Sequence, residues 1–254
     1  MSLLTTIDQM GREVTFSFPP KRVLSLVPSQ TEFLLDIGAP VVGRTKFCVH
    51  PKKSVIDIPI IGGTKKFRFD RVRELKPDLI IGNKEENYKE GIEALEADFP
   101  VWISDIYSLE DAFQMMSSLG RLCDLEDASR QIILDCRKST ENIKNTKKGT
   151  VLYLIWKNPW MAAGSYTFID HLLTHLGYQN IIQKNRYPTF EDHDIDLLDP
   201  DHIFLSSEPY PFKKDHLSQV KSKWPNAHCQ LVDGEIYSWY GSRLRYWKKK
   251  HNVL

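Results

Sequence analysis

Short runs of β-branched and aliphatic residues alternate with amphipathic segments along most of the chain. The runs at 22–28 (RVLSLVP), 79–82 (LIIG) and 101–106 (VWISDI) predict buried strands. The segments at 29–38 (SQTEFLLDIG) and 84–98 (KEENYKEGIEALEAD) predict helices between them. This alternation is typical of an α/β fold with mostly parallel sheets.

Capping residues define the expected ends of the first predicted helix. Ser29 is the expected N-cap of the helix at 29–38, and Glu32, three residues later, is its expected capping-box partner. Gly38 supplies the expected C-terminal stop.

No strand pattern appears between Ser108 and Lys148, where two amphipathic segments follow one another. The second segment predicts a single helix of about 20 residues, roughly 30 Å long. Strand and helix patterns then resume, with a strand at 150–156 (TVLYLIW) and a helix at 165–178. We therefore predict two α/β, Rossmann-like lobes, residues 1–124 and 148–254, joined by one long rigid helix, residues 125–147.

The charge balance restricts the class of partner. The 254 residues contain 34 Lys and Arg against 33 Asp and Glu, a formal net charge of +1. No global field draws the chain to nucleic acid or to an anionic membrane, so we expect no nucleic-acid partner. The four cysteines are widely spaced without a CxxC pair, which is typical of small core residues.

The common catalytic motifs are absent: there is no GxSxG elbow, no Walker loop and no GxGxxG turn. His171 and His175 have the spacing of a zinc-binding helix, but Leu172 occupies the place of the catalytic glutamate. Cys48 and His50 are weak metal-ligand candidates, because two ligands do not complete a site. A metal-dependent enzyme or sensor using these residues, together with His193, stays open as an alternative.

Aromatic side chains follow the predicted strands of both lobes. Aromatic residues at strand ends favour a cleft lined with flat surfaces. A second group lies near the C-terminus in EIYSWYGSRLRYW, residues 235–247, where Arg243 is expected to pair with an anionic ligand group. The aromatic candidates of the two groups are Phe47, Trp156, Trp160, Tyr187, Trp239 and Tyr240.

Four stretches together resemble a known family. They are PKRVLSLVPSQTEFLLDIGAPVVGRTKFCVHP, VRELKPDLIIG, LIWKNPWMAAGSYTFIDHLLTHLGYQNII and YSWYGSRL. They are similar to the substrate-binding proteins of cobalamin and iron-siderophore ABC importers, and the cobalamin branch fits best. The resemblance implies two α/β lobes joined by a rigid helix, a ligand held between the lobes, and no catalysis.

The resemblance also implies roles for individual residues. Phe47 and Tyr187 match aromatic ligand contacts, and Trp239 with Tyr240 fall in the binding loop before the last helix. Lys46, Arg243 and Glu208 are expected to orient the polar edge of the ligand.

The chain departs from the family pattern at two places. Thr64 and Lys65 stand where the cobalamin binder has a tryptophan, and Ser238 replaces an acidic residue. The expected ligand is therefore a metal chelate: cobalamin or another corrinoid, a ferric siderophore, or haem. No further cofactor is expected.

The same resemblance implies a membrane permease as partner. Proteins of this kind dock through one acidic residue on each lobe; Asp70 matches the first, and Glu191, Asp192 or Asp194 the second. We expect a monomer that is periplasmic or membrane-anchored outside the cytoplasm. No signal peptide or apolar run of about 18 residues is visible, so a cytoplasmic corrinoid-handling protein stays an alternative.

Overall fold

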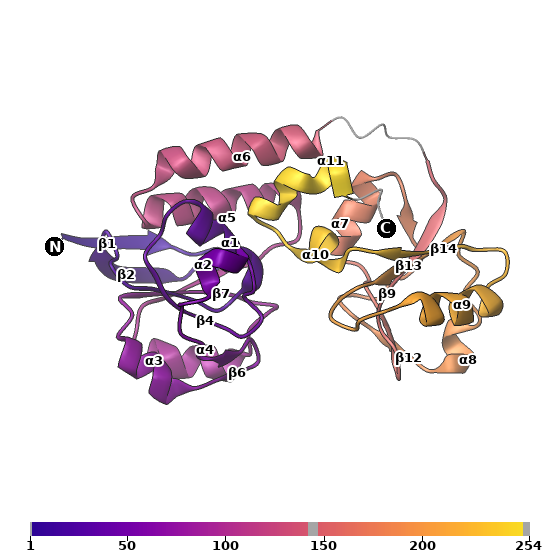
Figure 1. Cartoon of the computed structure of the whole chain (residues 1–254), viewed down its shortest axis with the longest axis horizontal. Helices are drawn as coiled ribbons and strands as arrows, with labels where there is room; N and C mark the ends of the chain where they lie inside the picture. Colours follow the sequence, from indigo (N-terminus) through magenta and orange to yellow (C-terminus); the bar gives the residue numbers. More distant parts are fainter. Residues whose placement is uncertain (1, 142–146, 251–254) are drawn as a thin grey trace. The chain divides into compact units, whose positions relative to one another are not determined.

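The computed structural model describes residues 2–141 and 147–250 (Figure 1), and the chain falls into two compact units. Unit 1 comprises Met1–Ile106, Glu110–Cys136 and Tyr240–Arg243, and unit 2 comprises Tyr107–Leu109, Arg137–Trp239 and Leu244–Leu254. Both units combine helices with β-sheets, which confirms the predicted α/β class. The predicted boundaries of continuous lobes stay a prediction. A short segment near the end of the chain belongs to unit 1, which the sequence pattern did not indicate.

The main sheet of unit 1 has four parallel strands in the order β4-β3-β7-β8. The chain leaves β3 toward β4 on one side, and later builds β7 and β8 on the other side. The order therefore reverses beside β3, and ligands of open α/β sheets bind outside the carboxyl ends of the strands at such a point. The strands are β3 (Val23–Ser25), β4 (Val41–Arg44), β7 (Leu79–Asn83) and β8 (Val101–Ser104).

Helices cover both faces of this sheet. In Figure 1, α1 and α5 lie on one face, and α3 and α4 on the other. Two antiparallel hairpins complete the strands of unit 1, β1 (Ser2–Ile7) with β2 (Glu13–Phe18), and β5 (Gly62–Gly63) with β6 (Lys66–Phe67). The helices are α1 (Pro28–Asp36), α2 (Lys52–Val55), α3 (Phe69–Leu75), α4 (Lys89–Glu96) and α5 (Leu109–Leu122).

The predicted cap of α1 is wrong. The helix starts at Pro28 with Val27 as N-cap, and no side chain caps it. Proline suits the first turn because it has no N–H to leave unpaired. Glu32 instead faces the interior, where it meets Arg243.

The long predicted helix is shorter than expected. The helix α6 (Glu126–Thr140) lies beside α5, and the Ser129 hydroxyl donates to the carbonyl of Met116 at 2.9 Å. Residues 147–149 are not helical, and 142–146 lie outside the described residues. A rigid helical connection between two lobes stays a prediction.

Unit 2 contains a six-stranded mixed sheet. The strand order is β12-β10-β9-β13-β14, and β11 pairs in parallel with β9. Strand β10 is antiparallel to both of its neighbours, β9 and β12. The chain leaves β9 toward β11 on one side and toward β13 on the other, so the order again reverses, here beside β9. The strands are β9 (Thr150–Trp156), β10 (Trp160–Ala162), β11 (Gln179–Asn180), β12 (Thr189–Phe190), β13 (His202–Ser206) and β14 (His228–Val232).

The helices of unit 2 are mostly short. Thr167 caps α7 by accepting from the Asp170 N–H, and Asp233 caps α10 by accepting from the Glu235 N–H. Within the described residues, no helix is long and apolar enough to cross a membrane. The helices are α7 (Phe168–His175), α8 (Asp192–Ile195), α9 (Lys214–Lys223), α10 (Gly234–Ser238), the 3-10 helix η1 (Ser242–Tyr246) and α11 (Trp247–Lys250).

Candidate functional site

The loop after β4 presents an aromatic ring at the carboxyl edge of the unit 1 sheet. The buried guanidinium of Arg44 donates to the carbonyls of Val55 and Cys48, both at 3.0 Å, which fixes the loop from inside. Phe47 points outward with half of its surface exposed, and the Lys46 ammonium lies 4.9 Å from the centre of its ring. Both predicted ligand contacts of this loop are therefore accessible.

Cys48, the next residue, points inward. Its Sγ lies 3.0 Å from the Thr31 hydroxyl and 3.1 Å from the Thr45 hydroxyl, and the side chain is fully buried. Burial raises the pKa of the thiol, so the thiolate that a metal requires is disfavoured. Cys48 is therefore a packing residue, which contradicts its weak candidacy as a metal ligand.

The remaining metal candidates do not form a site either. Across residues 2–141 and 147–250, no three His, Cys, Asp or Glu side chains are grouped to hold a metal ion, and this includes His50 and His193. The His171 and His175 rings stack 6.2 Å apart, and a His175 ring nitrogen bonds the Thr140 carbonyl at 2.7 Å.

A polar residue that the sequence reasoning missed organises the same edge of unit 1. The buried Asn87 amide donates to the Thr64 carbonyl at 3.1 Å, and its oxygen accepts from the Asn83 N–H at 2.9 Å. This side chain ties the β5–β6 hairpin to the end of β7. The signal was present as two asparagines four residues apart, directly after a buried strand.

In unit 2, the loops after β9 and β13 meet at the point where the strand order reverses. The Tyr210 N–H donates to the Ile155 carbonyl at 3.3 Å, and the Trp156 and Tyr210 rings form an edge contact at 5.5 Å. Trp156 is 39% exposed, as a ligand contact requires. Tyr187 is half-buried, in a loop that precedes β12.

Glu208 lies just after β13 in a polar setting. One carboxylate oxygen accepts from the Trp239 indole N–H at 2.9 Å and from the Ser238 hydroxyl at 3.1 Å. Burial raises the pKa of Glu208, the nearby Glu235 raises it further, and the two hydrogen bonds oppose the shift. Ser238 is thus a partner of Glu208.

Trp160 is a core residue, which contradicts its predicted role as a ligand contact. Only 6% of it is exposed, and its ring meets Trp224 edge-on at 6.4 Å. Its indole N–H donates to the Asp192 carboxylate at 2.7 Å. The antiparallel strand β10 turns this side chain into the cluster that fills one face of the sheet.

The C-terminal aromatics are also mostly internal. Trp239 is 7% and Tyr240 6% exposed, so neither presents a stacking surface in this structure. The Arg243 guanidinium donates to both oxygens of Glu32, at 3.0 and 2.9 Å, and both side chains are buried. Arg243 is thus held by an internal carboxylate, which argues against the predicted pairing with a ligand anion.

The acidic docking candidates lie on the surface of their own units. Asp70 is in the first turn of α3 with a 67% exposed side chain, 3.8 Å from Arg68. Glu191, Asp192 and Asp194 are all exposed at the start of α8. The hydrogen bond from Trp160 lowers the pKa of Asp192 most, and the charge of Lys223 adds to this.

Aromatic and charged side chains at the carboxyl ends of parallel strands are thus present in both units. A model of the family described as "Periplasmic binding protein" matches residues 23–224. This chain belongs to that family.

Relatives and solved structures agree with this assignment. An uncharacterized ABC transporter substrate-binding lipoprotein of Bacillus subtilis is 24% identical over 262 residues, which span 95% of this chain and 82% of that protein. A vitamin B12-binding protein of Vibrio campbellii is 22% identical, over 87% of this chain and 81% of its own length.

Three solved structures share the fold at low identity. The vitamin B12-binding protein of Vibrio cholerae superimposes with a TM-score of 0.77 at 17% identity, over 92% of this chain and 95% of that one. A haem-binding protein of a Roseiflexus species gives 0.78 at 17%, over 90% and 95%. A siderophore-binding protein in complex with acinetobactin and ferric iron gives 0.76 at 16%, over 98% and 100%.

Proposed function

We propose that this protein is the substrate-binding component of an ABC importer, which captures a metal chelate outside the cytoplasm and delivers it to a membrane permease. The candidate ligands are cobalamin or another corrinoid, a ferric siderophore, and haem. The transport role is inferred from a relative named as an ABC transporter component. The choice of ligands is inferred from a relative and from structures of similar fold that are named as binding vitamin B12, haem or a ferric siderophore. No catalytic step is part of this proposal.

One observation on this chain carries the choice of ligand type. Two aromatic rings, Phe47 and Trp156, are well exposed at the carboxyl ends of parallel strands, one in each unit. An exposed ring beside charged groups suits a flat or macrocyclic chelate, because ring stacking buries apolar area while the polar edge stays hydrogen-bonded. That the ligand lies between two lobes stays a prediction.

A ligand screen tests this function. Cyanocobalamin, haem, a ferric tris-catecholate and a ferric tris-hydroxamate are titrated separately while tryptophan fluorescence is recorded, and calorimetry checks each apparent hit. Saturable one-to-one binding of at least one chelate is expected, and Trp156→Phe should reduce the quenching. Absence of binding by all four would contradict the proposal.

Permease docking is tested separately. Asp70→Lys is expected to weaken association with the permease, because reversal of an exposed charge turns attraction into repulsion at an interface. Chelate affinity should not change. Loss of chelate binding in this variant would place Asp70 at the ligand, and Glu90→Lys, an exposed change on α4, is the control.

A further inference from the structure

Three lysines lie in or beside the β5–β6 hairpin, against which Phe47 packs. In the β5–β6 hairpin, Gly63 pairs with Lys66, and directly opposed residues of an antiparallel pair point to the same face. A Cβ on Gly63 would lie 3.4 Å from the Phe47 ring and 3.7 Å from Cε of Lys46. Phe47, Lys46 and Lys66 therefore share one face of the hairpin, and Lys65 lies in its turn. We call these four residues the lysine face.

The lysine face is firmly attached to unit 1. The Lys46 N–H donates to the Gly62 carbonyl at 2.8 Å, and the Lys65 ammonium donates to the Glu85 carbonyl at 2.6 Å. Phe67 anchors the hairpin from below, since it is buried and its ring lies 4.9 Å from that of Tyr88. Such attachment fixes the backbone of the lysine face and the Lys65 ammonium before a ligand arrives, which lowers the entropic cost of binding.

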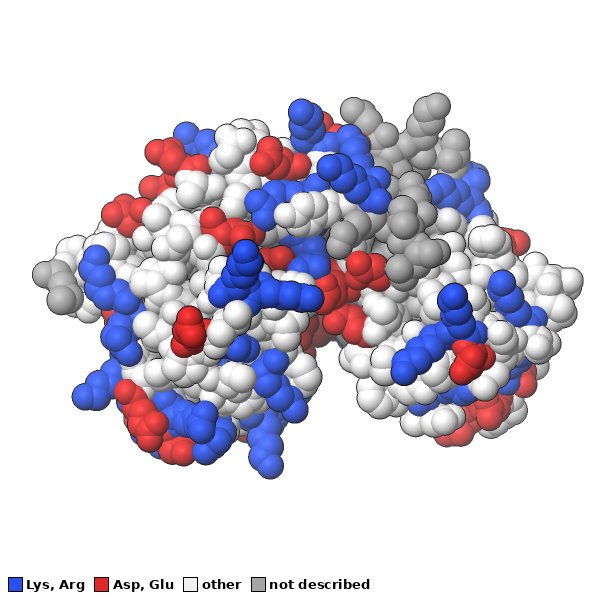
Figure 2. All heavy atoms as spheres, viewed as in Figure 1, with Lys and Arg blue, Asp and Glu red and all other residues white. Residues whose placement is uncertain are grey.

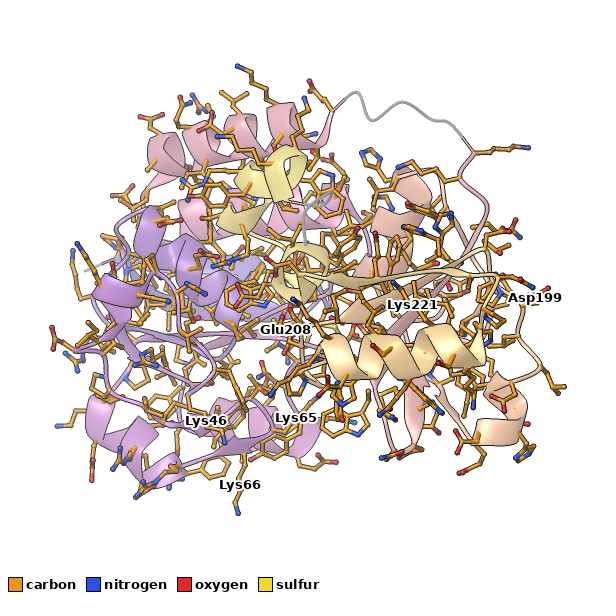
Figure 3. The ribbon with its side chains drawn as sticks, turned by 45° about the vertical axis from the view of Figure 1, so that its right-hand side comes forward. Lys46, Lys65, Lys66, Asp199, Glu208 and Lys221 are labelled. Atoms are coloured by element: carbon orange, nitrogen blue, oxygen red, sulfur yellow. The ribbon has the colours of Figure 1, made fainter. Side chains whose placement is uncertain are left out.

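The charge of this face is not balanced locally. All three lysines are exposed, and none forms an ion pair with a carboxylate of the described residues. Lys84, in the same unit, differs because Asp105 neutralises it at 2.7 Å. Figure 3 shows the three labelled lysines together around β6, and Figure 2 shows Lys and Arg side chains gathered in that part of unit 1. An anion here would relieve the repulsion between like charges.

Resting on the proposed function, we propose that the lysine face selects chelates of net negative charge, with carboxylate or catecholate groups, over neutral chelates. The Phe47 ring supplies a flat apolar contact, the Lys46 ammonium lies 4.9 Å from its centre, and Lys66 shares the same face of the hairpin. A neutral ligand stacks on the ring but gains nothing from the charges, whereas a polyanion gains from each of them. The balanced net charge of the whole chain makes this selection local.

Two iron complexes of similar size but different net charge test the selection. A ferric tris-catecholate carries three negative charges, and a ferric tris-hydroxamate is neutral. The parent protein is expected to bind the trianion roughly 10-fold or more tightly, because exposed charge pairs contribute about 2- to 5-fold each. K46Q/K65Q/K66Q should remove this preference, while K214Q/K221Q/K249Q, which removes the same charge elsewhere, should keep it. Added salt should weaken trianion binding by the parent protein and leave neutral binding unchanged.

Folding is controlled in the same experiment. Thermal unfolding must be unchanged in the triple variant, and K65R, which keeps charge and donor, should retain the preference. Equal binding of both complexes by the parent protein would overturn the selection while leaving the proposed function intact. Binding of the parent protein and the triple variant to vesicles of anionic phospholipid is measured as well. The selection would be overturned if the triple variant lost only vesicle binding and kept its preference for the trianion. If neither these complexes, haem nor cyanocobalamin binds, both the proposed function and the selection fail.

Discussion

The loop after β4 and the C-terminal segment 235–247 both contain aromatic and basic side chains, but the fold exposes the ring of the first and buries most of the second. In the loop, a single aromatic ring, Phe47, stays half exposed above a glycine. In the C-terminal segment, Trp239, Tyr240 and Arg243 are almost completely buried. Tyr237 and Trp247 of the C-terminal segment pack against each other, whereas the neighbours of Phe47 include Lys46 and Gly63 and leave half of the ring exposed.

The largest effect is expected where the C-terminal segment buries charge. Arg243→Ala leaves Glu32 buried without its bidentate partner, which should cost about 3–5 kcal/mol of unfolding free energy. Urea unfolding measures the loss. Arg73→Ala, which removes an exposed pair with Asp98, is the control and should cost less than about 1 kcal/mol. Equal losses would mean that the Arg243 pair is solvated.

The next effect compares a tryptophan of the C-terminal segment with the exposed tryptophan at the end of β9. Trp239→Phe removes the N–H donor to Glu208 and should cost about 1–3 kcal/mol, because the carboxylate is partly buried. Trp156→Phe changes a more exposed ring and should cost less than about 0.5 kcal/mol. Urea unfolding measures the loss of unfolding free energy in both variants. A larger loss for Trp156→Phe than for Trp239→Phe would contradict the comparison.

Substitution of Phe47 should reduce chelate affinity more than stability, unlike substitution of the buried aromatics. Phe47→Ala is expected to weaken the binding of an accepted chelate about 5-fold or more, since a stacked aromatic contributes on the order of 1 kcal/mol. Its unfolding free energy should change by less than about 1 kcal/mol. Tyr246→Ala, at a comparably exposed aromatic, is the control and should leave affinity unchanged. A large loss of stability with unchanged affinity would make Phe47 a structural residue.

The smallest effect is a pH dependence at Glu208. Because burial raises the pKa of this carboxyl, the native state keeps its proton at pH values where the unfolded state has lost it. Stability should therefore fall as pH rises from about 4.5 through the raised pKa, and Glu208→Gln should abolish that part of the decrease. Urea midpoints at several pH values measure it, with the exposed Glu90→Gln as control. An identical decrease in Glu208→Gln would assign the pH dependence to another group.

Much of the fold could be predicted from the chain itself. Residues 79–82 and 151–156 are continuous apolar runs, and they lie in the largely buried strands β7 and β9, which pair in parallel with their neighbours as expected. Phe47, which follows β4, and Trp156, the last residue of β9, are exposed where strands end, but Trp160, expected to be exposed by the same reasoning, is buried.

Prediction from the sequence failed where a residue's partner is distant along the chain. Glu32 fits the spacing of a capping box, yet its partner is Arg243, more than two hundred residues away. Lys66 gave rise to no prediction from the sequence, and only the register of the hairpin places it on the face of Phe47.

Local pattern therefore determined the class of fold, the order of its elements and the aromatic character of the strand ends. Only the tertiary structure decided which aromatics are covered and which charges are paired. The physical reason is that periodicity and propensity act within a few residues, whereas burial and ion pairing depend on which distant segments pack together. Trp160 and Trp156 illustrate this, since they lie four residues apart on neighbouring strands and one enters the core while the other stays exposed.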